Sequence, residues 1–271
     1  MLKQRIITAI ILALGAVWAL FEATPNVWAM ILFGVGLIAA WEWAGFAKIT
    51  SVWQKALYAF LVMLVTYAGV EFLNDGAIIG STLLEAFILM AVVFAYQYFK
   101  GESKPSSMSL ILLFGGLFIS LFVITMIQFR AHFSAEALLM SLFVIWAIDT
   151  GAYFSGRKFG RNKLAQYVSP GKTWEGVYGG TILAFFVALT GLYLVQPSLT
   201  VHFSLFAIMA AMIALFSVLG DLFESVMKRQ VGLKDSGSIL PGHGGVLDRI
   251  DSLIIAVPMF YILWTYASVQ G

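Results

Sequence analysis

Ionisable residues gather in one segment of a chain that is otherwise strongly apolar. The segment runs from Gly220 to Ser252, in a sequence that is 61% hydrophobic, and it has carboxylates near both ends. Between these carboxylates lie cationic side chains, several glycines, a proline and a histidine. Such a composition favours phosphate chemistry. Cationic side chains attract phosphate oxygens, and a flexible backbone can turn its N–H groups toward them.

Three aspartates are candidates for a metal site. Asp149 and Asp221 fall late in two apolar runs, and Asp248 opens another. A charged side chain in the apolar zone costs at least ~2.5 kcal/mol on insertion scales, so such residues are functional by default. Carboxylates with water and phosphate oxygens are the typical environment of Mg²⁺, and three converging aspartates would bind it. The alternative is that each aspartate pairs with a nearby Lys or Arg and links two helices.

Helical spacing places further polar groups beside two of these aspartates. Three residues follow Asp221 on the same helix face: Glu224, Ser225 and Lys228. Asp251 follows Asp248 at the start of the last apolar run, where a helix N-terminus favours ionised carboxylates. The two faces predict a metal cradle, and an i, i+4 pair between Glu224 and Lys228 is the simpler alternative.

The polar loop between these faces supplies groups that suit phosphate. Its cations, set against Asp235, are Lys228, Arg229, Lys234 and Arg249. Gly242, Gly244 and Gly245 allow positive φ and a close approach of the backbone to a ligand. His243 is assigned to phosphate contact, with proton transfer or bracing of the loop as alternatives. Ordinary positive charge on a cytoplasmic loop would explain the cations but not the glycines and histidine.

A second basic segment occupies residues 156–176. The run from Ser169 to Thr173 has the composition of a phosphate-binding loop, but the Walker spacing is absent and we expect no strand before it. Lys172 with the hydroxyls of Ser169 and Thr173 at a helix start still predicts phosphate binding. The alternative is a basic segment that lies on anionic lipid.

The elements that must position these residues are membrane-spanning helices. The mean hydropathy of +0.93, the 11% of charged residues and apolar runs of about 20 residues predict an all-α polytopic membrane protein. Nine helices are predicted, at residues 6–21, 27–46, 53–72, 78–99, 110–129, 135–154, 177–195, 203–224 and 250–269. A signal peptide is the alternative for the first run. Glu42 and Glu85 fall inside predicted helices, and the sequence identifies no partner for either.

The distribution of cations predicts the orientation. With nine helices and the N-terminus in the cytoplasm, every Lys and Arg except Arg130 lies on the cytoplasmic side, and the C-terminus lies outside. Both polar loops, 155–176 and 225–248, are then cytoplasmic. Residues 1–135 are interpreted as scaffold helices and residues 136–271 as the catalytic half. The absence of cysteine excludes thiolate catalysis, and a net charge of +2 does not indicate nucleic-acid binding.

The polar segment closely resembles the phosphatidate cytidylyltransferase (CDP-diacylglycerol synthase) family. That family's signature is Ser-x-x-Lys-Arg, four residues, Lys-Asp-Ser-Gly, then Leu-Pro-Gly-His-Gly-Gly, two residues and Asp-Arg-x-Asp. It is matched here by Ser225, Lys228, Arg229, 234–237, 240–245, Asp248, Arg249 and Asp251. Residues 149–153 and 169–176 also resemble family segments, so the resemblance covers roughly residues 149–252.

The resemblance implies transfer of CMP from CTP to phosphatidic acid on the cytoplasmic side of a bacterial inner membrane, by a homodimer that needs Mg²⁺, with a second cation left open. The predicted catalytic residues are Asp221, Lys234, His243 and Asp248. The predicted substrate-binding residues are Ser169, Lys172, Thr173, Ser225, Lys228, Arg229, Asp235, Gly244, Gly245 and Arg249. The predicted metal ligands are Asp149, Asp221, Asp248 and Asp251.

A cation-coupled transporter is the alternative function, because carboxylates near a membrane can relay cations. Transporter sites usually lie near the bilayer midplane and often show repeat symmetry. Here the charges fall at one surface, and no internal repeat is visible.

Overall fold

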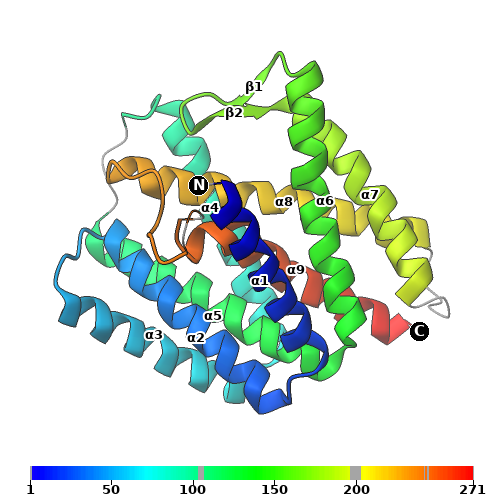
Figure 1. Cartoon of the computed structure of the whole chain (residues 1–271), viewed down its shortest axis with the longest axis horizontal. Helices are drawn as coiled ribbons and strands as arrows, with labels where there is room; N and C mark the ends of the chain where they lie inside the picture. The colour runs from blue at the N-terminus through cyan, green and yellow to red at the C-terminus, as the bar shows by residue number, and fades with distance from the viewer. Residues whose placement is uncertain (1, 103–106, 196–202, 241, 243, 271) are drawn as a thin grey trace. The chain divides into compact units, whose positions relative to one another are not determined.

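The computed structural model describes residues 2–102, 107–195, 203–240, 242 and 244–270, and within them it contains nine α-helices (Figure 1). The helices are α1 (Leu2–Phe21), α2 (Pro25–Phe46), α3 (Val52–Phe72), α4 (Asp75–Tyr98), α5 (Met108–His132), α6 (Ala135–Phe159), α7 (Trp174–Val195), α8 (Phe203–Gln230) and α9 (Leu247–Gln270). Helices α2 to α9 are each long and apolar enough to cross a membrane. The chain is thus an integral membrane protein, and all nine predicted helices are confirmed.

Four helices extend further into the polar segments than predicted, because α6 and α8 end later and α7 and α9 begin earlier. Helix α6 continues to Phe159 and helix α8 to Gln230. Lys228, predicted both on the helix face of Asp221 and among the loop cations, therefore lies with Arg229 in the last turn of α8, and Arg249 lies in the first turn of α9. Cations stabilise a helix C-terminus, so the charged residues prolong α8 instead of ending it.

A short β-hairpin joins α6 to α7. Strand β1 (Lys163–Ala165) pairs antiparallel with β2 (Ser169–Thr173), and β2 leads directly into α7. The expectation that no strand precedes Lys172 is therefore wrong. The carboxylate of Glu175, in the first turn of α7, accepts the backbone N–H groups of Arg161 and Asn162 and so ties down the hairpin. The strands are too short to leave an alternating pattern in the sequence.

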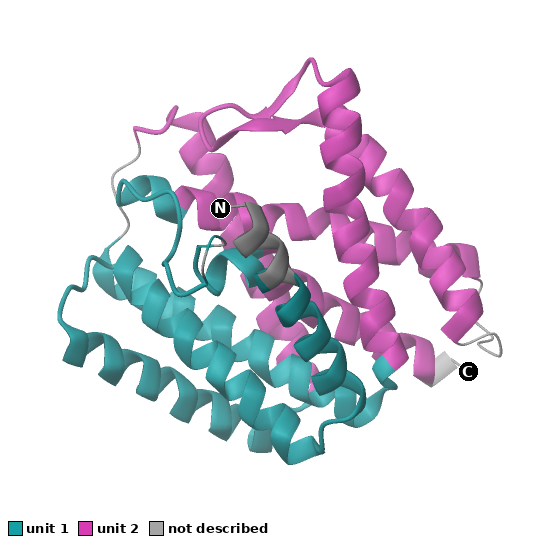
Figure 2. Ribbon diagram, viewed as in Figure 1, with its two compact units in different colours: residues 1–74, 104–135, 227–251 teal, residues 75–103, 136–226, 252–271 magenta. Residues whose placement is uncertain are grey.

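The chain folds into two compact units, each built from three separate segments (Figure 2). Unit 1 comprises residues 1–74, 104–135 and 227–251, and unit 2 comprises residues 75–103, 136–226 and 252–271. Helix α8 contributes to both units, and so does α9. The division into scaffold residues 1–135 and catalytic residues 136–271 is a functional one and stays a prediction.

In unit 1, helices α2, α3 and α5 pack against one another. The indole N–H of Trp43 in α2 donates to the carbonyl of Ile111 in α5 at 2.7 Å. A Cβ at Gly115 would overlap the Trp43 ring, so the glycine lets α5 lie directly against the indole. Small residues commonly allow such close approach between membrane helices.

In unit 2, glycines bring α6 and α7 close together. A Cβ at Gly151 would lie 2.8 Å from the Cα of Gly180, and a Cβ at Gly180 would overlap the carbonyl of Ile148. Thr173 caps α7, because its hydroxyl accepts the N–H of Gly176 at 3.2 Å. This packing fixes the end of the hairpin against the last turns of α6, where Asp149 and its neighbours lie.

Candidate functional site

A cavity of about 440 Å³ in unit 2 collects most of the charged residues predicted for that unit. Its walls come from α6, the hairpin, the start of α7 and the later turns of α8. The polar residues that line it are Asp149, Tyr153, Arg157, Lys172, Thr173 and Asp221. Asp149 and Asp221, two of the three aspartates predicted to converge, line this cavity together with Lys172, and the inclusion of Asp248 stays a prediction.

The cavity combines two carboxylates with two cations. Lys172 Nζ lies 2.7 Å from Asp221 Oδ2, and the two side chains are 25% and 35% exposed. Asp149 lies on the α6 wall of the same cavity. Among the residues that the structure describes, no three His, Asp or Glu side chains form a group that could hold a metal ion. Asp149 and Asp221 therefore offer a pair of carboxylates, to which other ligands would have to be added.

Two residues of this cavity were not among the predicted site residues, although one of them, Arg157, falls in the basic segment 156–176. Tyr153 and Arg157 line it, and Arg157 Nη1 donates to the Tyr153 hydroxyl at 3.0 Å. Both could have been found from spacing, because they follow Asp149 by four and eight residues and so share its helix face.

The hydroxyl-bearing residues of unit 2 that were predicted to bind substrate contact residues close to them in the sequence. Ser225 Oγ lies 3.4 Å from Asp221 Oδ1, one helical turn away on α8. Ser169 begins β2 and pairs with Ala165 across the hairpin. Thr173 is 7% exposed and accepts the N–H of Gly176. Their roles in substrate binding stay predictions.

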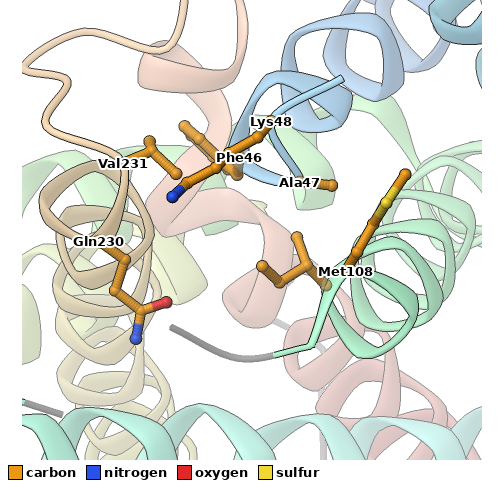
Figure 3. A pocket seen from close by; sticks show the side chains of 7 residues that line it. Phe46, Ala47, Lys48, Met108, Gln230 and Val231 are labelled. Atoms are coloured by element: carbon orange, nitrogen blue, oxygen red, sulfur yellow. The ribbon is translucent and has the colours of Figure 1, made fainter. Parts of the chain in front are cut away.

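A smaller pocket of about 210 Å³ lies in unit 1 (Figure 3). It is lined by Phe46, Ala47, Lys48, Met108, Ile111, Gln230 and Val231. The lining is mainly apolar, and no residue in it belongs to the predicted site.

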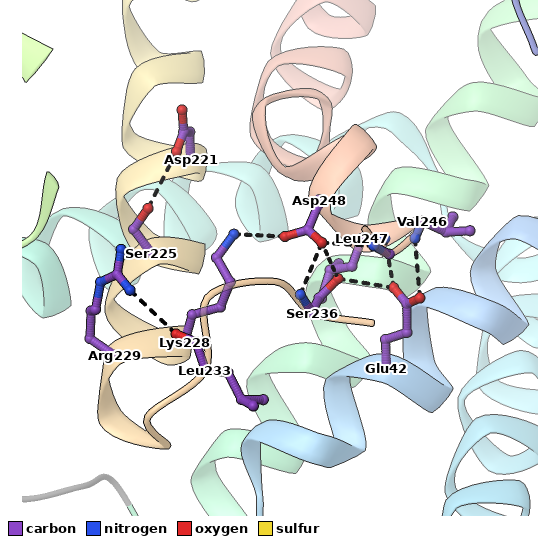
Figure 4. Close-up of polar contacts among 11 residues, drawn as sticks. Glu42, Asp221, Ser225, Lys228, Arg229, Leu233, Ser236, Val246, Leu247 and Asp248 are labelled. Atoms are coloured by element: carbon purple, nitrogen blue, oxygen red, sulfur yellow. Dashed lines mark hydrogen bonds and ion pairs between the residues drawn. The ribbon is translucent and has the colours of Figure 1, made fainter. Parts of the chain in front are cut away.

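Asp248 is the centre of a polar cluster in unit 1, formed with Glu42, Lys228, Ser236 and Gly245 and called here the Asp248 cluster (Figure 4). Asp248 Oδ1 lies 2.7 Å from Lys228 Nζ. Its Oδ2 accepts the N–H groups of Ser236 and Gly245 at 2.9 and 2.8 Å, and the Ser236 hydroxyl at 3.0 Å. Lys228 and the two loop N–H groups thus hold this carboxylate in a defined orientation, and the Ser236 hydroxyl contacts it as well.

Glu42 is the member of this cluster that sequence reasoning could not assign. The buried carboxylate contacts Ser236 and the backbone N–H groups of Val246 and Leu247. The visible signal was an acidic residue within an apolar run, which indicated burial. The partners lie 194 to 205 residues away, so no local pattern could reveal them.

The other predicted residues of unit 1 lie around the polar loop. Lys234, Asp235 and Arg249 are exposed. Arg229 Nη1 lies 3.4 Å from the carbonyl of Leu233, and Gly244 has a φ of +82°. Asp251 is half-buried in α9. His243 lies outside the described residues, so its assignment to phosphate stays a prediction.

Comparison with known proteins decides the family. The pattern of the cytidylyltransferase family matches residues 3–267. A phosphatidate cytidylyltransferase of Haemophilus influenzae is 37% identical, over 96% of this chain and 97% of its own length. The phosphatidate cytidylyltransferase of Pseudomonas aeruginosa is also 37% identical over 97% of each chain, and one from Helicobacter pylori is 32% identical over 96% and 91%. The chain belongs to the cytidylyltransferase family.

The cytidylyltransferase match is broader than the motifs indicated. The resemblance read from the sequence covered roughly residues 149–252, whereas the family match begins at residue 3. It therefore includes helix α2 and Glu42. In this member of the cytidylyltransferase family, both the cavity of unit 2 and the Asp248 cluster of unit 1 fall within the matched region.

Proposed function

We propose that the chain is a membrane nucleotidyltransferase that moves CMP from CTP to phosphatidate, giving CDP-diacylglycerol and pyrophosphate for phospholipid synthesis. The names and full-length similarity of its relatives support this substrate pair. The structural observation that carries the proposal is the cavity in which Lys172 is paired with Asp221 and Asp149 shares the wall. The comparisons do not favour a cation-coupled transporter.

In this reaction an oxygen of the phosphatidate phosphate attacks the α-phosphorus of CTP in line. A new P–O bond forms, and the bond between the α-phosphorus and the bridging oxygen breaks, so pyrophosphate leaves with the bonding electron pair. The attacking phosphate monoester is already anionic at neutral pH, so no strong general base is needed. The main barrier is repulsion between two polyanions, which positioning and positive charge reduce.

Cationic side chains of this chain are proposed to neutralise that charge. Lys172, at the end of β2, would bind phosphate oxygens at the cavity, and Arg157 on α6 would add a second cation. Lys228, Arg229 and Lys234 would hold the triphosphate or the lipid headgroup. The proposal also retains the predicted substrate-binding residues Ser225, Asp235 and Arg249. It retains His243 as a catalytic residue.

Mg²⁺ is the proposed cofactor, and the donors of the cavity suit it. Mg²⁺ is commonly bound by one or two carboxylates together with substrate phosphates and water. Asp149 and Asp221 supply two such carboxylates at one cavity. Asp248 and Asp251 stay proposed ligands, and a second cation stays open. When bound, Mg²⁺ would withdraw charge from the phosphates.

We also propose where the chain works and in what form. The distribution of cations favours a cytoplasmic position for both polar loops, on the side where CTP is found, and the bacterial origin of the relatives favours the inner membrane. A site at the bilayer edge lets a soluble nucleotide meet a headgroup whose acyl chains stay in the membrane. A homodimer stays a proposal drawn from the family resemblance.

The test is incorporation of CTP labelled at the α-phosphorus into chloroform-extractable lipid by the purified protein. Reactions contain phosphatidate and Mg²⁺ together, each alone, or EDTA. Label that enters lipid only when both are present supports the reaction and its metal requirement. A folded protein that transfers no label would exclude the proposed function, and label without Mg²⁺ would exclude the metal requirement alone.

A further inference from the structure

Glu42 is a buried carboxylate of α2 that holds the start of α9. Only 4% of the residue is exposed. Its Oε1 accepts the N–H of Val246 at 3.1 Å, and its Oε2 accepts the N–H of Leu247 at 2.8 Å. The first N–H groups of a helix have no partner within the helix, and a charged acceptor satisfies them well. Glu42 therefore fixes the backbone that leads into Asp248.

The hydroxyl of Ser236 connects Glu42 to Asp248 (Figure 4). Ser236 Oγ lies 3.1 Å from Glu42 Oε2 and 3.0 Å from Asp248 Oδ2. A hydroxyl carries one proton, so Ser236 donates to only one of the two carboxylates at a time. Its peptide N–H donates to Asp248 at 2.9 Å. The orientation of Asp248 thus depends on a serine that Glu42 also contacts.

Glycines let the loop backbone lie directly on both carboxylates. A Cβ at Gly237 or Gly245 would overlap the carboxylate of Glu42. A Cβ at Gly244 would lie 2.7 Å from Asp248 Oδ2, closer than real Cβ atoms come to a neighbour. The loop therefore has no space for another side chain between its backbone and these two acids. A change at Glu42 therefore reaches Asp248 through close contacts with the loop backbone and Ser236.

We infer that Glu42 is a positioning residue for the transfer reaction, acting on Asp248 through Ser236 and the backbone of residues 245–247. The inference rests on the proposed function, in which Asp248 belongs to the catalytic machinery. Loss of the Glu42 charge releases the start of α9 and the loop, and Asp248 then samples more orientations. Small displacements of a reacting group lower the rate of the chemical step more than they lower substrate affinity.

The experiment compares Glu42→Gln, Glu42→Asp, Ser236→Ala and the Glu42→Gln/Ser236→Ala double variant with the full-length wild type in lipid nanodiscs. Glu42→Gln keeps the size of the side chain but turns an amide NH₂ toward groups that are themselves donors. We expect kcat for CDP-diacylglycerol formation to fall about 10- to 100-fold, with KM for CTP changed by less than about threefold. Glu42→Asp keeps the charge and should retain more activity than Glu42→Gln.

The control is Glu71→Gln, which removes the same charge from an exposed position on α3 in the same unit. It should leave kcat unchanged.

Amide hydrogen exchange separates positioning from general loss of stability. In Glu42→Gln, exchange should accelerate at the N–H groups of Ser236 and Gly245, which donate to Asp248, while α2 and α5 keep wild-type rates. In the double variant, kcat should fall no further than in the more damaged single variant, because both changes break one connection.

Three results would overturn the inference: wild-type kcat in Glu42→Gln, losses that multiply in the double variant, or exchange that accelerates throughout unit 1. A wild-type protein that forms no CDP-diacylglycerol would instead overturn the proposed function. The exchange measurement needs no substrate, so it tests the hold of Glu42 on the loop in either case.

Discussion

Lys228 Nζ and Asp248 Oδ1 lie 2.7 Å apart, and the two side chains are only 12% and 6% exposed. A shielded ion pair of this kind gains little net stability, because removing both charges from water offsets their attraction. Removing one partner is costly, since the other charge is left without compensation. The pair links the last turn of α8 to the first turn of α9 and so fixes both ends of the polar loop.

Asp248→Asn should abolish CMP transfer and lower the free energy of unfolding, because it leaves Lys228 without its partner, while the protein stays folded. Asparagine keeps the shape of the side chain but removes the charge that faces Lys228 and the two loop N–H groups. We expect transfer of labelled CMP to fall by at least about 100-fold, the scale reported for loss of one preorganised electrostatic group in an active site. Circular dichroism and size-exclusion chromatography check the fold. Near-normal activity in the folded variant would remove Asp248 from the catalytic machinery.

Lys172→Met should weaken nucleotide use. The change removes the cation that lies 2.7 Å from Asp221 at the cavity of unit 2. Hydrogen bonds to charged groups contribute about 1.5–3 kcal/mol, so kcat/KM for CTP should fall about 10- to 100-fold. Lys158→Met is the matched control, because Lys158 lies on α6 outside the cavity lining. Equal kcat/KM values in the two variants would contradict a phosphate-binding role for Lys172.

Gly245→Ala should disrupt the Asp248 cluster. The added methyl group would overlap Ser236 Oγ and the carboxylate of Glu42, and overpacking of this kind typically costs about 1–3 kcal/mol. We expect a lower midpoint of thermal unfolding together with loss of transfer activity. Gly34→Ala is the comparison. Gly34 lies on the same helix as Glu42, and a Cβ at Gly34 would meet nothing within 4 Å. If both variants unfold at the wild-type temperature, the result would contradict the claim that the loop packs closely against Glu42 at Gly245.

Gly180→Ala should loosen the contact between α6 and α7. Its Cβ would overlap the carbonyl of Ile148, and a rigid backbone cannot move aside as a flexible side chain can. Thermal unfolding in detergent should show destabilisation of about 1–3 kcal/mol. Gly80→Ala, on α4 of the same unit, meets nothing within 4 Å and should be tolerated. Equal stabilities would show that the two helices are not held together at this glycine.

The helices could be predicted from the sequence because each apolar run is long enough to cross a bilayer. Helix α3, for instance, was predicted at residues 53–72 and spans Val52–Phe72. The predicted helix ends next to polar loops were less accurate, because a membrane helix becomes polar in composition before it ends. Thus α8 continues for six residues beyond Glu224, the end that was predicted.

The residues of the candidate site could be predicted where they are charged residues within an apolar helix, because such residues are rare there. Asp149 and Asp221 stood out for that reason, and they share a cavity. Arg157 was placed in the basic segment 156–176 but not among the site residues, because a cation at the end of a membrane helix has an ordinary explanation in orientation. Glu42 was recognised as a buried acid, but its contacts depend on tertiary packing that no local spacing encodes.

The separation of Glu42 and Leu247 by 205 residues has a consequence for biogenesis. At ribosomal rates of about 5–20 residues per second, roughly 10–40 seconds pass between synthesis of the two residues. During that interval Glu42 has been synthesised, but the N–H groups that it binds have not yet been made. The polar loop can close only after nearly the whole chain has been translated, so transfer activity should be among the last properties that the nascent protein acquires.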